Sequence, residues 1–115
     1  MEKDIYKIMT NAQWAEFSAK GVFTGASIDL NDGYIHLSTA SQVRETAAKH
    51  FGGQNNLMLV AIVGEKLGTA LKFEVSRGGE LFPHLYSSLT LEHVLWAKPL
   101  PLGATGLHVF PETGQ

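Results

Sequence analysis

An unbroken apolar run at residues 57–63 constrains the fold of this chain more than any other feature. A strand that faces water on one side alternates apolar and polar residues, and this run does not alternate. It therefore predicts a central β-strand whose side chains pack against other elements on both faces. The run is far too short to cross a bilayer, which takes about 20 apolar residues, so we expect no membrane association.

Composition fits one globular domain. The chain has 115 residues, of which 44% are hydrophobic, and it contains no cysteine. We expect residues 1–115 to fold as a single domain, because a chain of this length matches one domain and buries roughly 65% of its unfolded surface. The lack of cysteine excludes disulfides, thiolate zinc sites and cysteine nucleophiles.

The balance of charge argues against an extended nucleic-acid surface. Nine Lys and Arg residues stand against eleven Asp and Glu residues, which gives a net charge of -2 without long runs of one sign. The amino terminus is charged from its second residue and lacks the apolar segment of a signal peptide. We expect a cytoplasmic protein, and nothing in the sequence identifies a partner protein.

Two helices have recognisable start signals. Thr10 and Gln13 have the spacing of a capping box, and a glycine follows at the position of a left-handed C-cap, so a helix is predicted over residues 11–20. Thr39 and Gln42 repeat the capping-box spacing, ahead of apolar residues at every fourth position. This pattern predicts a second helix that begins near Thr39.

Strands fill the second half of the chain. Leu71, Phe73 and Val75 alternate with polar residues, which predicts a half-buried strand. Further extended segments are predicted at residues 5–8, 34–38, 82–86, 93–97 and 107–110. Helices early and strands late indicate an α+β domain, with two or three helices packed on a mixed, mainly antiparallel sheet.

The segment 34–38 carries the first candidate site. Strand alternation places Tyr34, His36 and Ser38 on one face, directly before the helix that is predicted to begin near Thr39. An imidazole and hydroxyls beside the free amides of a helix N-terminus suit an anionic ligand. Alternatively, Ser38 or Thr39 only caps the helix, and His36 bonds a backbone carbonyl.

The second candidate site is the turn formed by Arg77, Gly78, Gly79 and Glu80. Adjacent glycines let the backbone approach a ligand closely, and the arginine fork matches phosphate or carboxylate. The alternative is a tight connection between strands with an exposed Arg77–Glu80 ion pair, which contributes only about 0 to 1 kcal/mol.

The third candidate site follows at residues 82–86. In an extended chain Phe82, His84 and Tyr86 share one side and form a wall that could stack on a base or a nicotinamide ring. Alternatively, Phe82 and Tyr86 belong to the core. The five histidines lack metal-ligand spacing, so no metal site is predicted, and no Gly-x-Ser-x-Gly elbow supports a serine triad.

Two stretches of the sequence are distinctive together, namely Asp32-Gly33-Tyr34-Ile35-His36-Leu37-Ser38-Thr39 and Ser76-Arg77-Gly78-Gly79-Glu80-Leu81-Phe82-Pro83-His84-Leu85-Tyr86. They resemble a family of small bacterial proteins catalogued as domain of unknown function 952. The resemblance covers residues 5–111, which is nearly the whole chain.

The His36-Leu37-Ser38 segment is also similar to a strand of the RNA 2'-phosphotransferases, which have the ADP-ribosyltransferase-like fold. That resemblance implies a split, mostly antiparallel sheet that holds NAD in a cleft. It implies that His36 faces the pocket, that Ser38 lies at its floor and that Tyr86 stacks on the nicotinamide. Classical ADP-ribosyltransferases also use a late glutamate, for which the candidates are Glu74, Glu80 and Glu92.

These observations lead to a small-molecule site for NAD or a related nucleotide, with ADP-ribosyl or glycosyl transfer as the reaction that the resemblance implies. NAD would be a substrate, and no cofactor is required. The candidate catalytic residues are His36 and His84, and the candidate ligand-binding residues are Tyr34, Ser38, Thr39, Arg77, Gly78, Gly79, Phe82 and Tyr86. The alternatives are a non-catalytic ligand- or partner-binding domain, and a hydrolase in which two histidines act as acid and base.

Overall fold

The computed structural model describes residues 4–111, apart from the side chains of Ser27, Ile28 and Arg77. Its strands are β1 (Asp4–Thr10), β2 (Val22–Phe23), β3 (Ile35–His36), β4 (Ser38–Thr39), β5 (Leu57–Val63), β6 (Leu71–Val75), β7 (Leu81–Leu85), β8 (Leu89–Thr90) and β9 (Val94–Pro99). Its helices are α1 (Asn11–Lys20), α2 (Ser27–Asp32) and α3 (Val43–His50), with short 3-10 helices η1 (Gly64–Ala70), η2 (Arg77–Gly79) and η3 (Leu91–His93).

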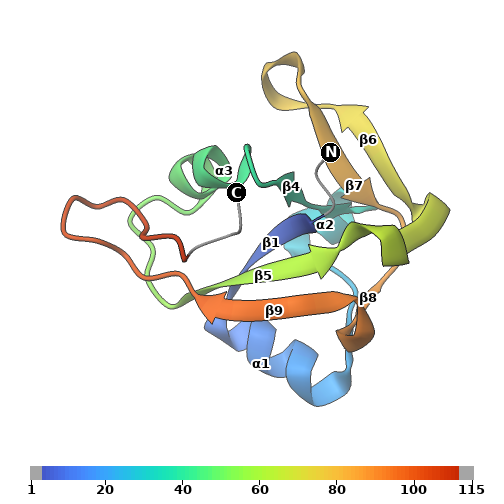
Figure 1. Cartoon of the computed structure of the whole chain (residues 1–115), viewed down its shortest axis with the longest axis horizontal. Helices are drawn as coiled ribbons and strands as arrows, with labels where there is room; N and C mark the ends of the chain where they lie inside the picture. The colour runs from blue at the N-terminus through green and yellow to red at the C-terminus, as the bar shows by residue number, and fades with distance from the viewer. Residues whose placement is uncertain (1–3, 112–115) are drawn as a thin grey trace.

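The largest sheet has four strands in the order β4-β1-β5-β9 (Figure 1). β5 pairs with β1 along its whole length and with β9 on its other side. Alternate residues of β5 face two different cores, because Leu59 packs in one cluster and Val60 and Ile62 in the other. The prediction of a central strand covered on both faces is therefore confirmed.

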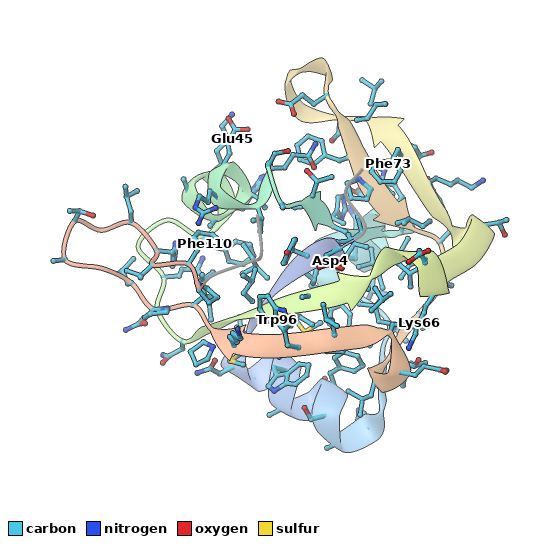
Figure 2. The ribbon with its side chains drawn as sticks, in the orientation of Figure 1. Asp4, Glu45, Lys66, Phe73, Trp96 and Phe110 are labelled. Atoms are coloured by element: carbon cyan, nitrogen blue, oxygen red, sulfur yellow. The ribbon has the colours of Figure 1, made fainter. Side chains whose placement is uncertain are left out.

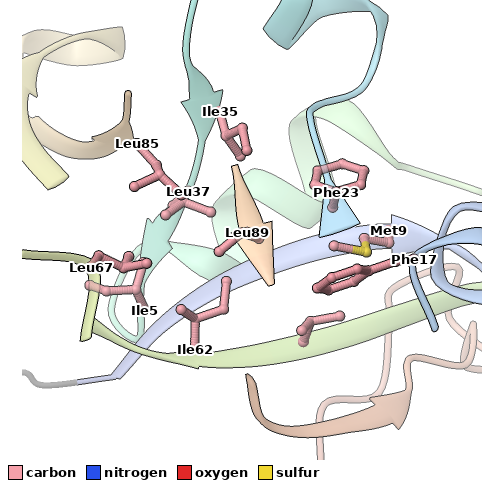
Figure 3. Close-up of a cluster of buried hydrophobic side chains, with 11 residues drawn as sticks. Ile5, Met9, Phe17, Phe23, Ile35, Leu37, Ile62, Leu67, Leu85 and Leu89 are labelled. Carbon is pink, nitrogen blue, oxygen red and sulfur yellow. The ribbon is translucent and has the colours of Figure 1, made fainter. Parts of the chain in front are cut away.

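Different elements cover the two faces of this sheet. On one face, α1 and side chains from β3 and β7 meet residues of β1 and β5, as Figure 3 shows for Phe17, Ile35 and Leu85. On the other face, α3 contributes Val43 and Ala47. The sheet is thus the middle layer, with a helix on each side of it.

A second sheet of three strands, in the order β3-β7-β6, lies beside the first (Figure 1). A third sheet joins only β2 and β8. All pairings between the named strands are antiparallel, so the α+β class and the mainly antiparallel character are confirmed. The predicted mixed character is wrong for the described residues, since no parallel pair joins their named strands.

Both predicted helices are present, but one of them begins further along the chain than predicted. α1 has the predicted bounds, with the Thr10–Gln13 capping box and a left-handed C-cap at Gly21. α3 begins at Val43 instead of near Thr39, because residues 40–42 form a turn. Half of the second capping box exists, since the Thr39 amide donates to Gln42 Oε1 at 3.0 Å. The short helix α2 was not predicted.

Three predicted strands differ from the structure. The segment 34–38 is split into β3 and β4, which belong to different sheets and flank Leu37. Residues 107–110 form no strand and contribute only an isolated bridge between His108 and Leu102. In β6 the apolar side is exposed, with Phe73 at 48% and Val75 at 70%, because this strand forms the outer edge of a projecting hairpin (Figure 2).

Candidate functional site

The pairing of β3 with β7 brings the first and third candidate sites together. His36 lies opposite His84 in the strand register, and their ring centroids are 5.6 Å apart. Residues of antiparallel strands that lie opposite each other share a face of the sheet. Two stretches that are far apart in the sequence thus form one cluster.

Tyr34 lies at the centre of this cluster. Its ring stacks on His84 with centroids 4.1 Å apart and an interplanar angle of 25°. The same ring is 4.7 Å from the His36 ring and 5.3 Å from the Tyr86 ring. Such ring contacts, at 4.5–7 Å or closer, hold aromatic side chains in defined orientations. We call Tyr34, His36, His84 and Tyr86 the ring cluster.

His36 lies between two carboxylates. Its Nδ1 is 2.6 Å from Asp29 Oδ1, and its Nε2 is 3.0 Å from Asp32 Oδ2. A neutral imidazole has a single N–H, so both contacts are hydrogen bonds only when the ring carries two protons. The His36 side chain is 31% exposed, which leaves its outer edge within reach of a ligand.

Asp29 anchors this arrangement from inside the molecule, where it is only 1% exposed. Its carboxylate accepts hydrogen bonds from Lys7 Nζ at 3.1 Å, from the Ala26 amide at 2.8 Å and from the His36 amide at 3.1 Å. Burial alone would raise the pKa of Asp29, but the charge of Lys7 and these hydrogen bonds outweigh it and hold the pKa below its ordinary value.

Lys7 is buried beside Asp29. Its ammonium group also donates to the His36 carbonyl at 3.0 Å. Burial lowers the pKa of Lys7, although the charge and hydrogen bond of Asp29 act in the opposite direction. Lys7 and Asp29 together fix both the backbone and the ring of His36.

Glu74 connects the other two members of the ring cluster. Its Oε1 accepts a hydrogen bond from the Tyr86 hydroxyl at 2.7 Å and lies 2.8 Å from His84 Nδ1. The hydrogen bonds from Tyr86 and then from His84 lower the pKa of Glu74. The hydrogen bond to Glu74 and partial burial raise the pKa of Tyr86 to about 12. The pair stabilises a charged carboxylate and a neutral phenol.

Glu74 is therefore the candidate glutamate that reaches the ring cluster. Glu80 is exposed in the turn after η2, where its carbonyl accepts from the Ser76 amide at 2.9 Å. Glu92 is exposed in η3, where its carbonyl accepts from Lys66 Nζ at 3.1 Å. Neither backbone contact involves the ring cluster.

An open hollow of about 260 Å³ adjoins the ring cluster. Its lining includes two tyrosines and three residues with hydroxyl side chains, and the lining residues are Thr24, Asp29, Leu30, Gly33, Tyr34, Ile35, Leu85, Tyr86, Ser87 and Ser88. His36 and His84 do not line it, but both contact Tyr34. We call this cavity the tyrosine hollow.

Several predicted ligand-binding residues lie apart from the tyrosine hollow. Ser38 is buried in β4, and its hydroxyl lies 3.0 Å from the Thr46 hydroxyl of α3. The Thr39 hydroxyl lies 3.1 Å from that of Ser41. Phe82 is buried in β7, as the core alternative proposed. Ser38, Thr39 and Phe82 are thus used in packing and in local hydrogen bonds. The alternative in which Ser38 or Thr39 caps the helix is wrong, since the N-cap of α3 is Gln42 and no side chain bonds at that cap.

The predicted phosphate grip lies at the tip of the β6–β7 hairpin. Gly78 and Gly79 have φ of 70° and 79° and form a tight connection closed by a hydrogen bond from the Gly79 amide to the Ser76 carbonyl at 3.0 Å. At about 3.3 Å per residue, this tip is roughly 15 Å along the strand from His84. The side chain of Arg77 lies outside the described residues.

A larger hollow of about 440 Å³ lies elsewhere, between α3 and the loop before residue 111. Arg44 and Phe110 belong to its lining, and the guanidinium lies 4.8 Å from the ring centroid. Glu45 of α3 and Phe110, both labelled in Figure 2, belong to its lining. This larger hollow contains no member of the ring cluster. The candidate site is therefore identified by its residues and not by the volume of the cavity.

Sequence reasoning missed the anchoring residues Lys7, Asp29 and Asp32. One signal was available for Lys7, which interrupts an otherwise apolar strand between Tyr6 and Ile8. Asp29 had no comparable signal, because α2 was not predicted. Among the described residues, no group of histidine, aspartate and glutamate side chains is arranged to hold a metal ion, and no helix is long and apolar enough to span a membrane.

Comparison with solved structures reveals close likeness over nearly the whole chain. The crystal structure of protein CC0527 from Caulobacter crescentus is 49% identical, with a TM-score of 0.88, over 92% of this chain and 93% of that one. Its solution NMR structure is 50% identical, with a TM-score of 0.83, over 91% of this chain and 90% of that one. No protein with a curated description matches the sequence significantly.

The sequence profile of one protein family agrees with this likeness. The profile described as protein of unknown function (DUF952) matches residues 8–97. That range includes His36, Glu74, His84 and Tyr86. The chain therefore belongs to the DUF952 family, as its two sequence motifs predict.

Proposed function

We propose that this protein binds NAD or a related nucleotide in the tyrosine hollow and transfers its ADP-ribosyl or glycosyl group. One observation carries the proposal: Tyr34 and Tyr86 line a hollow and also contact two histidines and a glutamate. Clefts that combine apolar walls with a few polar groups are the usual sites for small ligands.

The lining of the hollow suits a nucleoside unit. Aromatic faces stack on bases at about 1–3 kcal/mol per base. The hydroxyls of Thr24, Ser87 and Ser88 offer neutral partners for ribose. A volume of about 260 Å³ is just below the range of roughly 300–1,000 Å³ for drug-sized ligands, so one nucleoside would enter while the rest of a dinucleotide lies outside.

We also propose that the fold is ADP-ribosyltransferase-like. The separate antiparallel sheets and the His-Leu-Ser segment at residues 36–38 support this assignment. The resemblance implies that His36 faces the pocket and that Ser38 lies at its floor. His36 ends β3 at the ring cluster without lining the tyrosine hollow, and Ser38 has turned away toward α3. Fold likeness alone establishes no reaction, so the chemistry must be argued from the site.

Glu74 is the residue we assign to the transfer step. The C1'–N bond breaks with its electron pair on the nicotinamide nitrogen, and an acceptor hydroxyl bonds to C1' and loses its proton to solvent. A carboxylate fixed beside C1' stabilises the positive charge that develops there. The contacts of Glu74 with Tyr86 and His84 both use Oε1, so Oε2 is the oxygen we assign to the ribose hydroxyl.

The two histidines have different surroundings, which argues against hydrolysis by an acid–base pair. His84 is only 3% exposed and stacks behind Tyr34, so we assign it to positioning Tyr34 and Glu74. His36 is more exposed and would contact the ribose or carboxamide through Nε2, in place of Asp32. Hydrolysis by an acid–base pair would need both imidazoles within hydrogen-bond reach of the substrate, and the buried His84 does not fit that role.

Thermal unfolding and amide NMR spectra with NAD, ADP-ribose and AMP test the binding proposal. A ligand at 100 times its Kd adds about 2.7 kcal/mol to the free energy of unfolding. For a domain of this size, that corresponds to a rise in Tm of roughly ten degrees. Tyr86→Ala, with affinity about tenfold weaker, should reduce the rise to roughly half at the same ligand concentration, whereas the control Leu107→Ala, in the other hollow, should retain it. Unchanged Tm and spectra with all three ligands would overturn the proposal.

Nicotinamide release from NAD separates a transferase from a binding module. The wild type should release nicotinamide, and Glu74→Gln should reduce the rate by at least about 100-fold while NAD still binds. Binding without release in the wild type would support the non-catalytic alternative instead.

A further inference from the structure

We infer that the tyrosine hollow recognises its ligand through the base and the ribose and gains no affinity from phosphate. Its ligand class is therefore the nucleoside, either free or as the nucleoside end of a larger molecule. This inference rests on the proposed function and narrows it.

The lining of the hollow supplies no cation. All ten lining residues belong to the described part of the chain, and none of them is lysine, arginine or histidine. Phosphate sites in proteins use arginine forks, lysine charges or open helix N-termini. The α-helix at the hollow, α2, contributes Asp29, Leu30 and its C-cap Gly33. A carboxylate in the first turn of this helix and the negative end of its dipole at Gly33 both disfavour an anion.

Two side chains that can carry a positive charge, Lys7 and His36, contact the lining residue Asp29, and both already have partners. Lys7 bonds Asp29 and the His36 carbonyl, and the His36 ring lies between Asp29 and Asp32. Lys72 lies opposite His84 on the three-stranded sheet, but it does not line the hollow. Among the described residues that line the hollow, a phosphate would therefore meet only neutral donors.

Negative groups surround the tyrosines instead. Asp29 lines the hollow itself. Burial raises the pKa of Tyr34, and the charges of Asp32 and Glu74 raise it further. The same negative charges oppose a phosphate dianion placed beside the ring, because like charges repel strongly where water is displaced.

The neutral groups of the hollow match a nucleoside well. Two residues with aromatic rings, Tyr34 and Tyr86, and three with neutral hydroxyl groups, Thr24, Ser87 and Ser88, belong to its lining. Hydroxyl groups both donate and accept hydrogen bonds, as ribose hydroxyls require. The site thus has partners for a base and a sugar, and none for a phosphate charge.

Titration with matched ligand pairs tests this inference. NMR titrations of the wild type would compare nicotinamide riboside with nicotinamide mononucleotide and with NAD, and adenosine with AMP, at low and high salt. We expect the Kd values within each set to agree within about threefold, and to change little with salt. A nucleotide that binds at least about tenfold more tightly than its nucleoside, with salt-dependent affinity, would overturn the inference and leave the proposed function standing.

Two variants identify where a phosphate would act. Tyr86→Ala should weaken nucleoside and nucleotide equally, by about tenfold, because it removes a stacking face. Lys72→Met should change neither, since Lys72 lies outside the lining. A selective loss of nucleotide affinity in Lys72→Met would place the phosphate over β6 and contradict the inference. Failure of every ligand to bind would instead contradict the proposed function itself.

Discussion

Lys7 and Asp29 form an ion pair inside the molecule, where both have lost most of their contact with water. Replacing a buried pair by apolar residues is often neutral for stability, so stability alone does not explain why such a pair is present. Here each partner also bonds His36, through its carbonyl, amide or ring. The pair therefore defines the position of one side chain at the edge of the candidate site.

Lys7→Met should destabilise the fold by about 3–5 kcal/mol, because it leaves the Asp29 carboxylate buried without its cation. The double variant Lys7→Met with Asp29→Asn should be more stable than the single variant, since asparagine carries no charge and still accepts hydrogen bonds. Urea unfolding measures both. As a control, Lys20→Met removes an exposed ion pair with Glu16 and should change stability by less than about 1 kcal/mol.

Acid should weaken the fold through Asp29. The pKa of Asp29 is below its ordinary value of 3.8 in the folded state, so the unfolded chain binds the proton more readily. Its contribution is complete above the unfolded pKa and is lost as pH falls through the folded value. The free energy of unfolding should therefore fall below about pH 5, and less steeply in Asp29→Asn. Urea unfolding at a series of pH values measures both proteins. An equal fall in the free energy of unfolding with pH in the two would contradict this assignment.

Glu74 sets the titration of Tyr86. Its hydrogen bond is the main cause that raises the pKa of Tyr86 to about 12. Glu74→Gln removes the negative charge, so the pKa of Tyr86 should fall toward the ordinary value of about 10. NMR of the tyrosine ring carbons across alkaline pH follows this change. The Tyr6 signal, from the opposite core, serves as an internal reference.

Among the elements, α1 could be predicted from sequence because its signals are local. Thr10, Gln13 and Gly21 lie within or beside the helix that they delimit. Which face of β6 is covered could not be predicted from sequence, because that depends on segments far away in the chain. Phe73 and Val75 face water, while Glu74 on the opposite side meets His84 and Tyr86. Alternation revealed two sides of the strand but not which one is covered.

The C-cap of α2 offers a test at this scale. Gly33 has φ of 89° with open space where a Cβ would lie, so a side chain here meets backbone strain and no clash. Gly33→Ala should lower the free energy of unfolding by roughly 1–2 kcal/mol. Gly33→Asn should cost less, because asparagine adopts the left-handed conformation more readily. Thermal unfolding compares the two, and equal losses would contradict the strain explanation.

For the whole molecule, the sequence predicted the class and the central strand but only part of the candidate site. His36, His84 and Tyr86 came from motifs, yet their contact depends on a pairing between β3 and β7 that no local pattern encodes. Lys7 comes from a third strand, and Asp29 from a helix with weak signals. Lys7 and Asp29 meet only in the folded chain, so the spacing of charged residues along the sequence does not predict their ion pair.

The passage of the chain from β3 to β4 takes a single residue, Leu37, and joins two different sheets. His36 stands at that junction, so its place depends on the docking of both sheets as well as on its own strand. A partly assembled chain, with one sheet formed and the other loose, would keep much of its secondary structure and lose the ring cluster. The contact between the Tyr34 and His84 rings, followed by NMR, would then report completed assembly more strictly than circular dichroism does.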